Sequence, residues 1–331
     1  MRRLWTVLLP LERFCAATSV LAFVSMTLPP VAFAQSVDEL HRTLPVTLAA
    51  PVALDVDLPR GELQILYSRD GQVSINALAQ APAGTRLDKG FLESVLSIEQ
   101  DGNRIRIRHA SAASYPEDAI KVLYRIDVPY RTEVVSTLGD GKVFISGILG
   151  PVKAITHRGD IKASYVSNGV VAETQTGNLD FEVIGERVEA RTSSGNISCT
   201  RAAQGISAET NEGDITLMVV GPSTAIVKNG AGTIDVGGAR GSLVASTDAG
   251  ELRLKANPHG DWRLNSAAGA IRAQLPPTAQ FEVDATTNSG EIVVKRGDIA
   301  LSDDARHLHQ KTNGGGRQIQ IHTDRGKIVI E

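Results

Sequence analysis

The sequence predicts an all-β protein folded as a right-handed parallel β-helix, a β-solenoid with about 18 residues in each rung. Two observations predict this fold. A glycine recurs at a nearly constant spacing, and apolar residues alternate with polar ones on both sides of it. The composition agrees, with 31 glycines, 4% aromatic residues and no long stretch of helical periodicity, which is typical of short strands joined by frequent turns.

The recurring glycine defines the repeat. Its first copies are 18 residues apart, later copies follow at spacings of 19, 18, 19 and 21, and a final copy comes after a further 36: Gly141, Gly159, Gly177, Gly195, Gly213, Gly232, Gly250, Gly269, Gly290 and Gly326. Such a period indicates one supersecondary unit repeated along the chain.

The residues around the glycine repeat as well. Around Gly177 the order is Val170, Ala172 and Thr174 before the glycine and Leu179 and Phe181 after it. Most copies keep this order; the copy around Gly232 departs from it, with Lys228 or Asn229 near the Thr position. Two short strands with one buried face each, joined at a glycine corner, explain the pattern.

One such unit cannot bury its own apolar face, so successive units must stack and share a core. The stacked strands are then parallel, and the crossover preference of parallel strands predicts a right-handed coil. A β-propeller needs about 40–50 residues per blade, and the leucine-rich-repeat signature is missing.

The N-terminus is expected to be a signal peptide, residues 1–34. Arg2 and Arg3 precede an apolar stretch that ends at Ala32-Phe33-Ala34, a small-x-small cleavage site. Residues 35–133 are expected to form a less regular β region with early rungs and a cap, and residues 134–331 the solenoid.

Several segments carry local predictions. Residues 54–65 match the unit, Gly71 to Ile75 match it in part, and Asp101-Gly102 joins two strands of a hairpin. Residues 122–128 are expected to form a strand, Pro276-Pro277 a loop, and residues 300–316 a flexible excursion before the last copy.

Charge and cysteine content exclude several classes of function. Without residues 1–34 the chain holds 31 basic and 36 acidic residues, a net charge of −5, so nucleic acid is not an expected partner. Cys199 is then the remaining thiol, in the slot that Phe181 occupies one unit earlier, and is expected to be a buried small hydrophobe. No cofactor, metal site or membrane-spanning segment is expected in the mature chain.

Two copies of the unit, Glu189 to Ile197 (EARTSSGNI) and Ala208 to Leu217 (AETNEGDITL), together with Val128-Pro129-Tyr130, resemble the bacterial DUF4097 family of proposed adhesins. That family is similar to auto-transporter adhesin heads and pectin-lyase-like β-helices. The resemblance covers about residues 50–331 and implies a β-helix on an exported protein. It transfers no catalytic residues.

The candidate ligand-binding residues are polar side chains that directly follow the repeated glycine and would form a column: Asp160, Asn178, Asn196, Asp214, Glu251 and Glu291. Such a column could contact sugars or calcium, although Asp and Asn are also favoured at turns for local reasons. Arg158-Gly159-Asp160 lies in the repeat and is expected to be a turn.

We therefore expect a non-catalytic, adhesin-like structural or binding protein, exported to the periplasm or cell surface. Its expected partner is an envelope polysaccharide, a host or neighbouring cell surface, or an envelope protein. Two alternatives stay open: a β-helix polysaccharide lyase or hydrolase, which needs acidic side chains placed over a groove, and a periplasmic accessory of envelope stress signalling.

Overall fold

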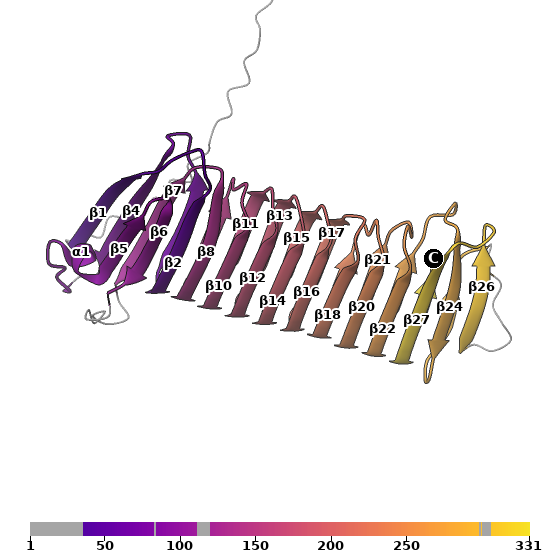
Figure 1. Ribbon diagram of the computed structural model, residues 1–331. Helices are drawn as coiled ribbons and strands as arrows, with labels where there is room; N and C mark the ends of the chain where they lie inside the picture. The colour runs from indigo at the N-terminus through magenta and orange to yellow at the C-terminus, as the bar shows by residue number, and fades with distance from the viewer. Residues whose placement is uncertain (1–35, 83, 111–119, 298, 300–305) are drawn as a thin grey trace, which may run out of the picture. The chain divides into compact units, whose positions relative to one another are not determined.

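The computed structural model describes residues 36–82, 84–110, 120–297, 299 and 306–331 (Figure 1). The expected signal peptide, residues 1–34, lies outside the described residues. The described residues form one compact unit. Among the described residues the one helix is α1 (Phe91–Val95), which is far too short to cross a membrane.

The described strands build two 14-stranded sheets, here called sheet A and sheet B. In spatial order sheet A consists of β1 (Ser36–Pro45), β4 (Gln72–Ala81), β7 (Lys121–Val128), β3 (Glu62–Tyr67), β9 (Val143–Ser146), β11 (Ile161–Val166), β13 (Leu179–Ile184), β15 (Ile197–Ala202), β17 (Ile215–Val220), β19 (Ile234–Val236), β21 (Leu252–Lys255), β23 (Ile271–Gln274), β28 (Ile328–Ile330) and β25 (Ile292–Val294). In spatial order sheet B consists of β5 (Leu96–Asp101), β6 (Arg104–His109), β2 (Val52–Arg60), β8 (Thr132–Asp140), β10 (Val152–Arg158), β12 (Val170–Thr176), β14 (Val188–Ser194), β16 (Ile206–Glu212), β18 (Ala225–Ala231), β20 (Leu243–Ala249), β22 (Trp262–Ala268), β27 (Arg317–Arg325), β24 (Phe281–Thr287) and β26 (His307–Thr312).

Each central rung contributes one strand to sheet B and the next strand to sheet A, and equivalent positions stack in register. Val170 pairs with Val188, and Val188 with Ile206, each offset by one repeat. The same holds for Leu179, Ile197 and Ile215 in sheet A. The pairing is parallel throughout these rungs, which confirms the predicted solenoid. Its right-handed sense stays a prediction.

The core lies between the two sheets. Side chains of alternate residues point inward from each strand, and Val188, Ile197, Ile206 and Ile215 are at most 1% exposed. Phe181 is fully buried in sheet A and stacks between two smaller side chains, Ala163 in the preceding rung and Cys199 in the following rung. Cys199 is buried as predicted, and burial raises the pKa of its thiol to about 12.

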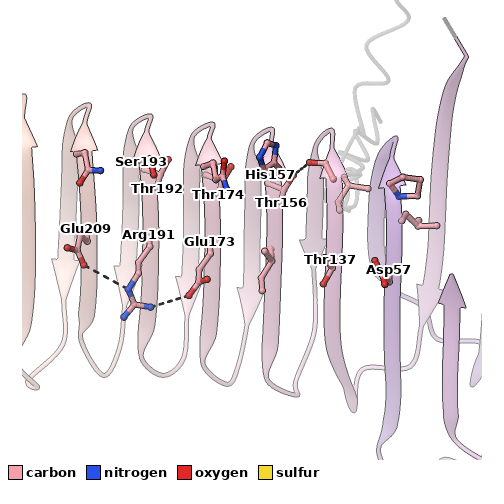
Figure 2. Close-up of a pocket in the computed structure, with 17 residues that line it drawn as sticks. Asp57, Thr137, Thr156, His157, Glu173, Thr174, Arg191, Thr192, Ser193 and Glu209 are labelled. Carbon is pink, nitrogen blue, oxygen red and sulfur yellow. Dashed lines mark hydrogen bonds and ion pairs between the residues drawn. The ribbon is translucent and has the colours of Figure 1, made fainter. Parts of the chain in front are cut away.

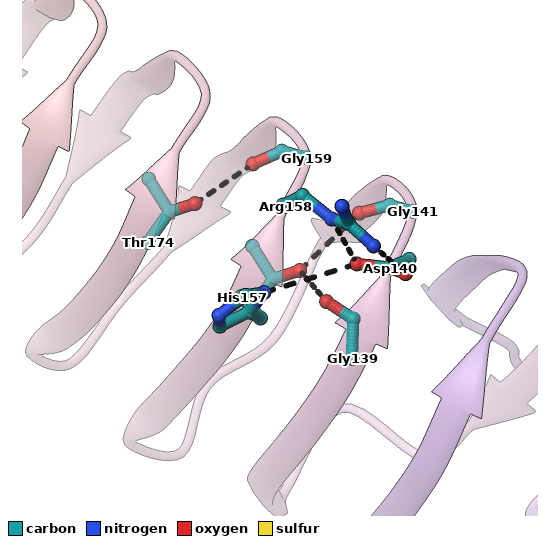
Figure 3. Close-up of polar contacts among 8 residues, drawn as sticks. Gly139, Asp140, Gly141, His157, Arg158, Gly159 and Thr174 are labelled. Carbon is teal, nitrogen blue, oxygen red and sulfur yellow. Dashed lines mark hydrogen bonds and ion pairs between the residues drawn. The ribbon is translucent and has the colours of Figure 1, made fainter.

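The corner between the two strands depends on the repeated glycine and threonine. Gly177 has a φ of +153°, a conformation that favours glycine. The buried Thr192 hydroxyl donates to the carbonyl oxygen of Gly177 in the preceding rung at 3.1 Å. Thr174 bonds Gly159 in the same way (Figure 3). In the departing copy Asn229 takes the threonine slot, and its amide donates to the Gly213 carbonyl at 2.8 Å.

At the N-terminal end the rungs are out of chain order. The rung β2–β3 lies directly beside β8–β9, and the rung β6–β7 lies on its other side. Antiparallel strands then extend the N-terminal edge of each sheet. In sheet B β5 pairs with β6, and in sheet A β4 pairs with β7 and β1 pairs with β4. The hairpin at Asp101-Gly102 and the strand at 122–128 are confirmed.

Two segment predictions need correction. Residues Gly71 to Ile75 are not a copy of the unit, because β4 runs antiparallel to β7; alternating Val and Ile residues suit either direction. The described part of 300–316, residues 306–316, is also more ordered than predicted: it forms β26, which pairs antiparallel with β24, and a turn that follows it. The last rung, β27–β28, is inserted between β22–β23 and β24–β25, and Pro276-Pro277 lies in a loop as predicted.

Candidate functional site

Four members of the predicted polar column form a hydrogen-bonded ladder along the stack. The side-chain oxygen Oδ1 of Asp160 accepts the backbone N–H of Asn178 at 2.9 Å. Asn178 does the same for Asn196 at 2.9 Å, Asn196 for Asp214 at 2.8 Å, and Asp214 for Thr233 at 2.7 Å. Each side chain therefore satisfies a turn N–H in the next rung, so these oxygens already serve the fold.

The two glutamates of the column lie apart from this ladder and are engaged in ion pairs. Glu251 accepts from Arg253 and Arg272, each at 2.6 Å, and the hydrogen bond from Arg253 is the main reason that the pKa of its carboxyl lies below the ordinary value. Glu291 pairs with Lys327 at 2.5 Å. The structure therefore does not bring the six predicted residues together as one site.

Replacing Asn196 with alanine is expected to lower the free energy of unfolding by about 0.5–1.5 kcal/mol, the net value of one hydrogen bond, because the Asp214 N–H loses its acceptor. Urea titration measures this change. Asn196→Asp keeps the acceptor oxygen and is expected to retain most of the stability. If the alanine variant loses ligand binding with unchanged stability, the column is a binding site instead.

The Arg158-Gly159-Asp160 tripeptide forms a corner, as predicted, and Arg158 is held by the preceding rung. Its guanidinium donates to both carboxylate oxygens of Asp140, at 2.8 and 2.7 Å (Figure 3). His157 lies farther from the same carboxylate, with 3.9 Å between Nδ1 and Oδ1. The hydrogen bond from Arg158 holds the pKa of Asp140 below its ordinary value of 3.8.

This ion pair predicts a small dependence of stability on pH. A carboxyl whose pKa is depressed by folding stabilises the fold above its unfolded pKa and loses that contribution as the pH falls through its folded pKa. Arg158→Gln is therefore expected to be less stable than the parent by under about 1 kcal/mol at neutral pH, since Asp140 is partly exposed. The difference should shrink as the pH falls below the ordinary carboxyl pKa of 3.8 and vanish once Asp140 is protonated in the folded state as well. Thermal unfolding at several pH values checks this, and a difference that grows in acid would contradict it.

A groove of about 690 Å³ crosses the outer face of sheet B, over the neighbouring strands β2, β8, β10, β12, β14 and β16 (Figure 2). Its lining comes from in-register outward positions. One row consists of Asp57, Thr137, Ile155, Glu173, Arg191 and Glu209. A second row, two residues farther along each strand, contains Gly139, His157, Gln175, Ser193 and Asn211.

Charge in the groove is organised around one cation. Arg191 reaches Glu173 at 3.2 Å and Glu209 at 4.0 Å, on the rungs before and after its own (Figure 2). Asp57 adds a further carboxylate at one end. The remaining polar side chains of the lining are serine and threonine hydroxyl groups, two amides and the imidazole of His157. The groove can therefore form hydrogen bonds with a long ligand at several successive rungs, and carboxylates outnumber guanidinium groups there.

Sequence reasoning did not identify this groove, although its signal is in the repeat. In four copies the residue directly before the repeated threonine lines the groove, namely Ile155, Glu173, Arg191 and Glu209. The 18-residue period places these four residues side by side. The polar column was singled out because it follows the glycine.

His307 and His309, on β26, lie outside the groove and face carboxylates of β24. In the part of the chain that the structure describes, no cluster of His, Cys, Asp and Glu suits a metal ion.

Comparisons with known proteins bear on the family. The model of the family described as "Toastrack DUF4097" matches residues 161–331, more than half of the chain. No curated protein matches the chain significantly.

Solved structures with a similar course of the chain include three bacterial proteins. A proposed cell adhesion protein from Clostridium sporogenes is 9% identical, with 88% of this chain and 97% of that one covered and a TM-score of 0.27. Proposed adhesins from Bacteroides fragilis (12% identical, 68% and 95% covered, TM-score 0.32) and Parabacteroides distasonis (11%, 88% and 97%, 0.29) are similar to it too. On the match of the family model, the chain belongs to the Toastrack DUF4097 family.

Proposed function

We propose that this chain is a non-catalytic binding protein of the bacterial envelope, exported to the periplasm or cell surface, which holds an extended neutral polysaccharide along the outer face of sheet B. The observation that carries the proposal is the groove whose polar lining repeats from rung to rung across six strands. The signal-peptide pattern of residues 1–34 supports export.

The repeat of the groove favours a polymer over a small molecule. Neighbouring strands lie about 4.8 Å apart, so equivalent hydroxyl and amide groups, such as those of Gln175, Ser193 and Asn211, recur at that interval along the stack. An extended sugar chain presents its own hydroxyl groups at a comparable repeat. Several weak hydrogen bonds along the polymer together then supply the binding free energy, and no deep pocket is needed.

Charge favours a neutral polymer over a polyanion. Asp57, Glu173 and Glu209 line the groove, and Arg191 is shared between two of them. A phosphate- or uronate-rich chain would meet a net negative surface, which weakens its association.

The same pair of carboxylates defines the enzymatic alternative. Glu173 and Glu209 flank Arg191, and glycoside hydrolysis needs two carboxyl groups on either side of a scissile bond, one of them protonated. Both carboxylates here instead approach one guanidinium, that of Arg191, which lies on the strand between them. We therefore assign the pair to positioning of Arg191 and not to chemistry.

A glycan array probed with the purified protein tests the proposal. We expect binding to neutral linear glycans and at least tenfold weaker binding by Ser193→Trp, which fills the groove with a bulky ring. Thr216→Trp, at an exposed position on sheet A, is the matched control and should bind like the parent. No glycan binding, or equal binding by Ser193→Trp, would contradict the proposal. Release of reducing ends that Glu173→Gln abolishes would establish the enzyme instead.

A further inference from the structure

Two hollows lie beside the groove on the same outer face of sheet B, nearer to the starts of its strands. The larger hollow, of about 320 Å³, lies over β8, β10, β12 and β14, and the smaller one, of about 200 Å³, over β6, β2 and β8. Val135, Lys153 and Val171 line the larger hollow, and each stands two residues before a groove residue on its strand. Such positions are about 6.6 Å apart, so a polymer in the groove can reach the hollows with its side groups.

Small residues between larger ones create both hollows. Gly169, directly before β12, stands between Pro151 and Arg187, which directly precede β10 and β14. A Cβ atom at Gly169 would meet one atom within 4 Å, the backbone oxygen of Arg187 at 3.3 Å, so the space outside this glycine is open. In the smaller hollow Ala53 on β2 likewise stands between two larger side chains of the neighbouring strands.

The larger hollow has an apolar floor. Val135 and Val171 stand in register on either side of Lys153, and Val135 is 44% exposed. Pro151 and Gly169 bound the hollow toward the strand starts. A small apolar group, such as a methyl group, would remove this floor from water and gain free energy by doing so. A polymer that bears hydroxyl groups alone would not make this contact.

The walls of the larger hollow offer a hydrogen-bond donor and an acceptor. Lys153 is exposed, and its ammonium group has no ion-pair partner among the described residues. Glu189, on the opposite wall, lies 3.8 Å from Arg187 and 3.9 Å from Arg191. These distances are too long for hydrogen bonds, so the carboxylate oxygens of Glu189 can accept one from a ligand.

The smaller hollow repeats this composition. Its apolar surface comes from Ala53 and Val135. Arg104 supplies an exposed cation that has no ion-pair partner in the described part of the chain, and Asp55 and Glu133 supply carboxylates. The strands on which the two hollows are centred, β2 and β12, are three rungs apart, about 14 Å. One extended chain can therefore place a side group in each hollow.

An acetamido group combines the three features that the hollows complement: a methyl group, a carbonyl oxygen and an N–H. We propose that the hollows bind the acetamido groups of a neutral glycan built from 2-acetamido sugars, an inference that rests on the proposed polysaccharide binding by the groove. In the larger hollow the methyl group packs on Val135 and Val171. Lys153 donates to the carbonyl oxygen, and Glu189 accepts the N–H, while the sugar rings stay over the groove.

The charge of the larger hollow favours a neutral side group over a charged one. Lys153 and Arg187 balance Glu133 and Glu189 in its lining. A carboxylate or an ammonium group would therefore gain no net attraction, and it would lose hydration on the apolar floor. A neutral group that brings its own donor and acceptor loses less.

Calorimetric titration with chitohexaose and cellohexaose tests the inference, because the two sugars share one backbone and differ in the group at C2, acetamido in the first and hydroxyl in the second. We expect chitohexaose to bind about tenfold more tightly. Equal binding of the two sugars would overturn this inference and leave the proposed function standing. If neither sugar binds, the inference is overturned as well, and the glycan array decides whether the proposed function falls with it.

Two variants locate the preference in the larger hollow. Lys153→Met keeps the length of the side chain but removes the donor, and it should weaken chitohexaose binding about threefold. Gly169→Leu fills the hollow, and its slot already holds Pro151 and Arg187 in the neighbouring rungs. Both variants should stay folded by circular dichroism and bind cellohexaose like the parent.

Lys228→Met is the matched control, at an exposed position on sheet B that lines neither the groove nor a hollow. It should bind both sugars like the parent. An undiminished preference for chitohexaose in Lys153→Met and Gly169→Leu would overturn the assignment of the acetamido group to the hollow.

Discussion

Replacing Gly195 with alanine is expected to lower the free energy of unfolding by at least about 3 kcal/mol, as both backbone strain and a steric clash are introduced. Gly195 has a φ of +151°, and a Cβ atom there would lie 2.0 Å from the carbonyl oxygen of Gly177 in the preceding rung. The obstacle is backbone, so no side-chain rotation relieves it. The two rungs must separate at the corner, and the hydrogen bond from Thr210 to the Gly195 carbonyl is disturbed as well. Urea titration of the variant measures the loss.

Gly102→Ala is the matched control for this substitution. Gly102 also has a positive φ, +57°, but a Cβ atom there meets nothing within 4 Å. This variant therefore measures the conformational cost of the substitution alone, which is about 1–2 kcal/mol. Equal losses for Gly102→Ala and Gly195→Ala would show that close stacking of the corners does not exist.

Phe181→Ala is expected to cost about 3–5 kcal/mol, the usual loss for a buried phenylalanine, because a cavity opens in the middle of the stack. The ring is fully buried and its in-register neighbours, Ala163 and Cys199, are too small to fill the space. Stacked columns with alternating large and small residues depend on each large member. Chemical denaturation again provides the measurement.

Phe144→Ala tests whether the loss comes from burial in the core. Phe144 lies on β9, two rungs before Phe181, at a partly exposed position on the outer face of sheet A. The same change of side chain there should cost about 1 kcal/mol or less. A loss below 1 kcal/mol for Phe181→Ala, or equal losses for the two variants, would contradict the inward orientation of Phe181.

The central rungs could be predicted from sequence because each one repeats the same pattern of apolar, threonine and glycine residues. Val170, Ala172 and Thr174 recur one repeat later as Val188, Ala190 and Thr192, so one period determines strand direction, register and inward face together. The repeated threonine also has a role that the structure explains, because the Thr192 hydroxyl donates to the Gly177 carbonyl at the corner of the preceding rung.

The two ends of the stack could not be predicted in the same way. The rungs β2–β3 and β27–β28 occupy positions that differ from their order in the chain. Nothing local encodes that order, since it depends on which exposed strand edge each segment meets. The prediction for Gly71 to Ile75 on β4 was wrong for a related reason. Alternation with a period of two identifies a buried face, and it is the same for parallel and antiparallel strands.

The candidate site could also be predicted only in part, where its residues belong to the repeated pattern. The polar column was predicted from its place after the glycine, and four of its members stack in successive rungs. Sequence could not decide between a ligand and the next rung as the partner of Asn178 and Asn196. The groove arises from outward positions in the unit, where the residue type varies from copy to copy. Tyr165 and Val183 share a corner slot with Gly147, and only coordinates reveal their left-handed backbone.

Paired cysteines on the outer face of sheet A test the stack most directly. Ser198 and Thr216 are in-register neighbours on β15 and β17, so their Cα atoms are about 4.8 Å apart, within the range of a disulfide. Ser198 and Asp235 lie two rungs apart, outside that range. With Cys199 replaced by alanine, mild oxidation should cross-link Ser198→Cys/Thr216→Cys and leave Ser198→Cys/Asp235→Cys with free thiols, as mass spectrometry reads out. Preferential cross-linking of the second pair would mean that the eighteen-residue copies do not lie on one another.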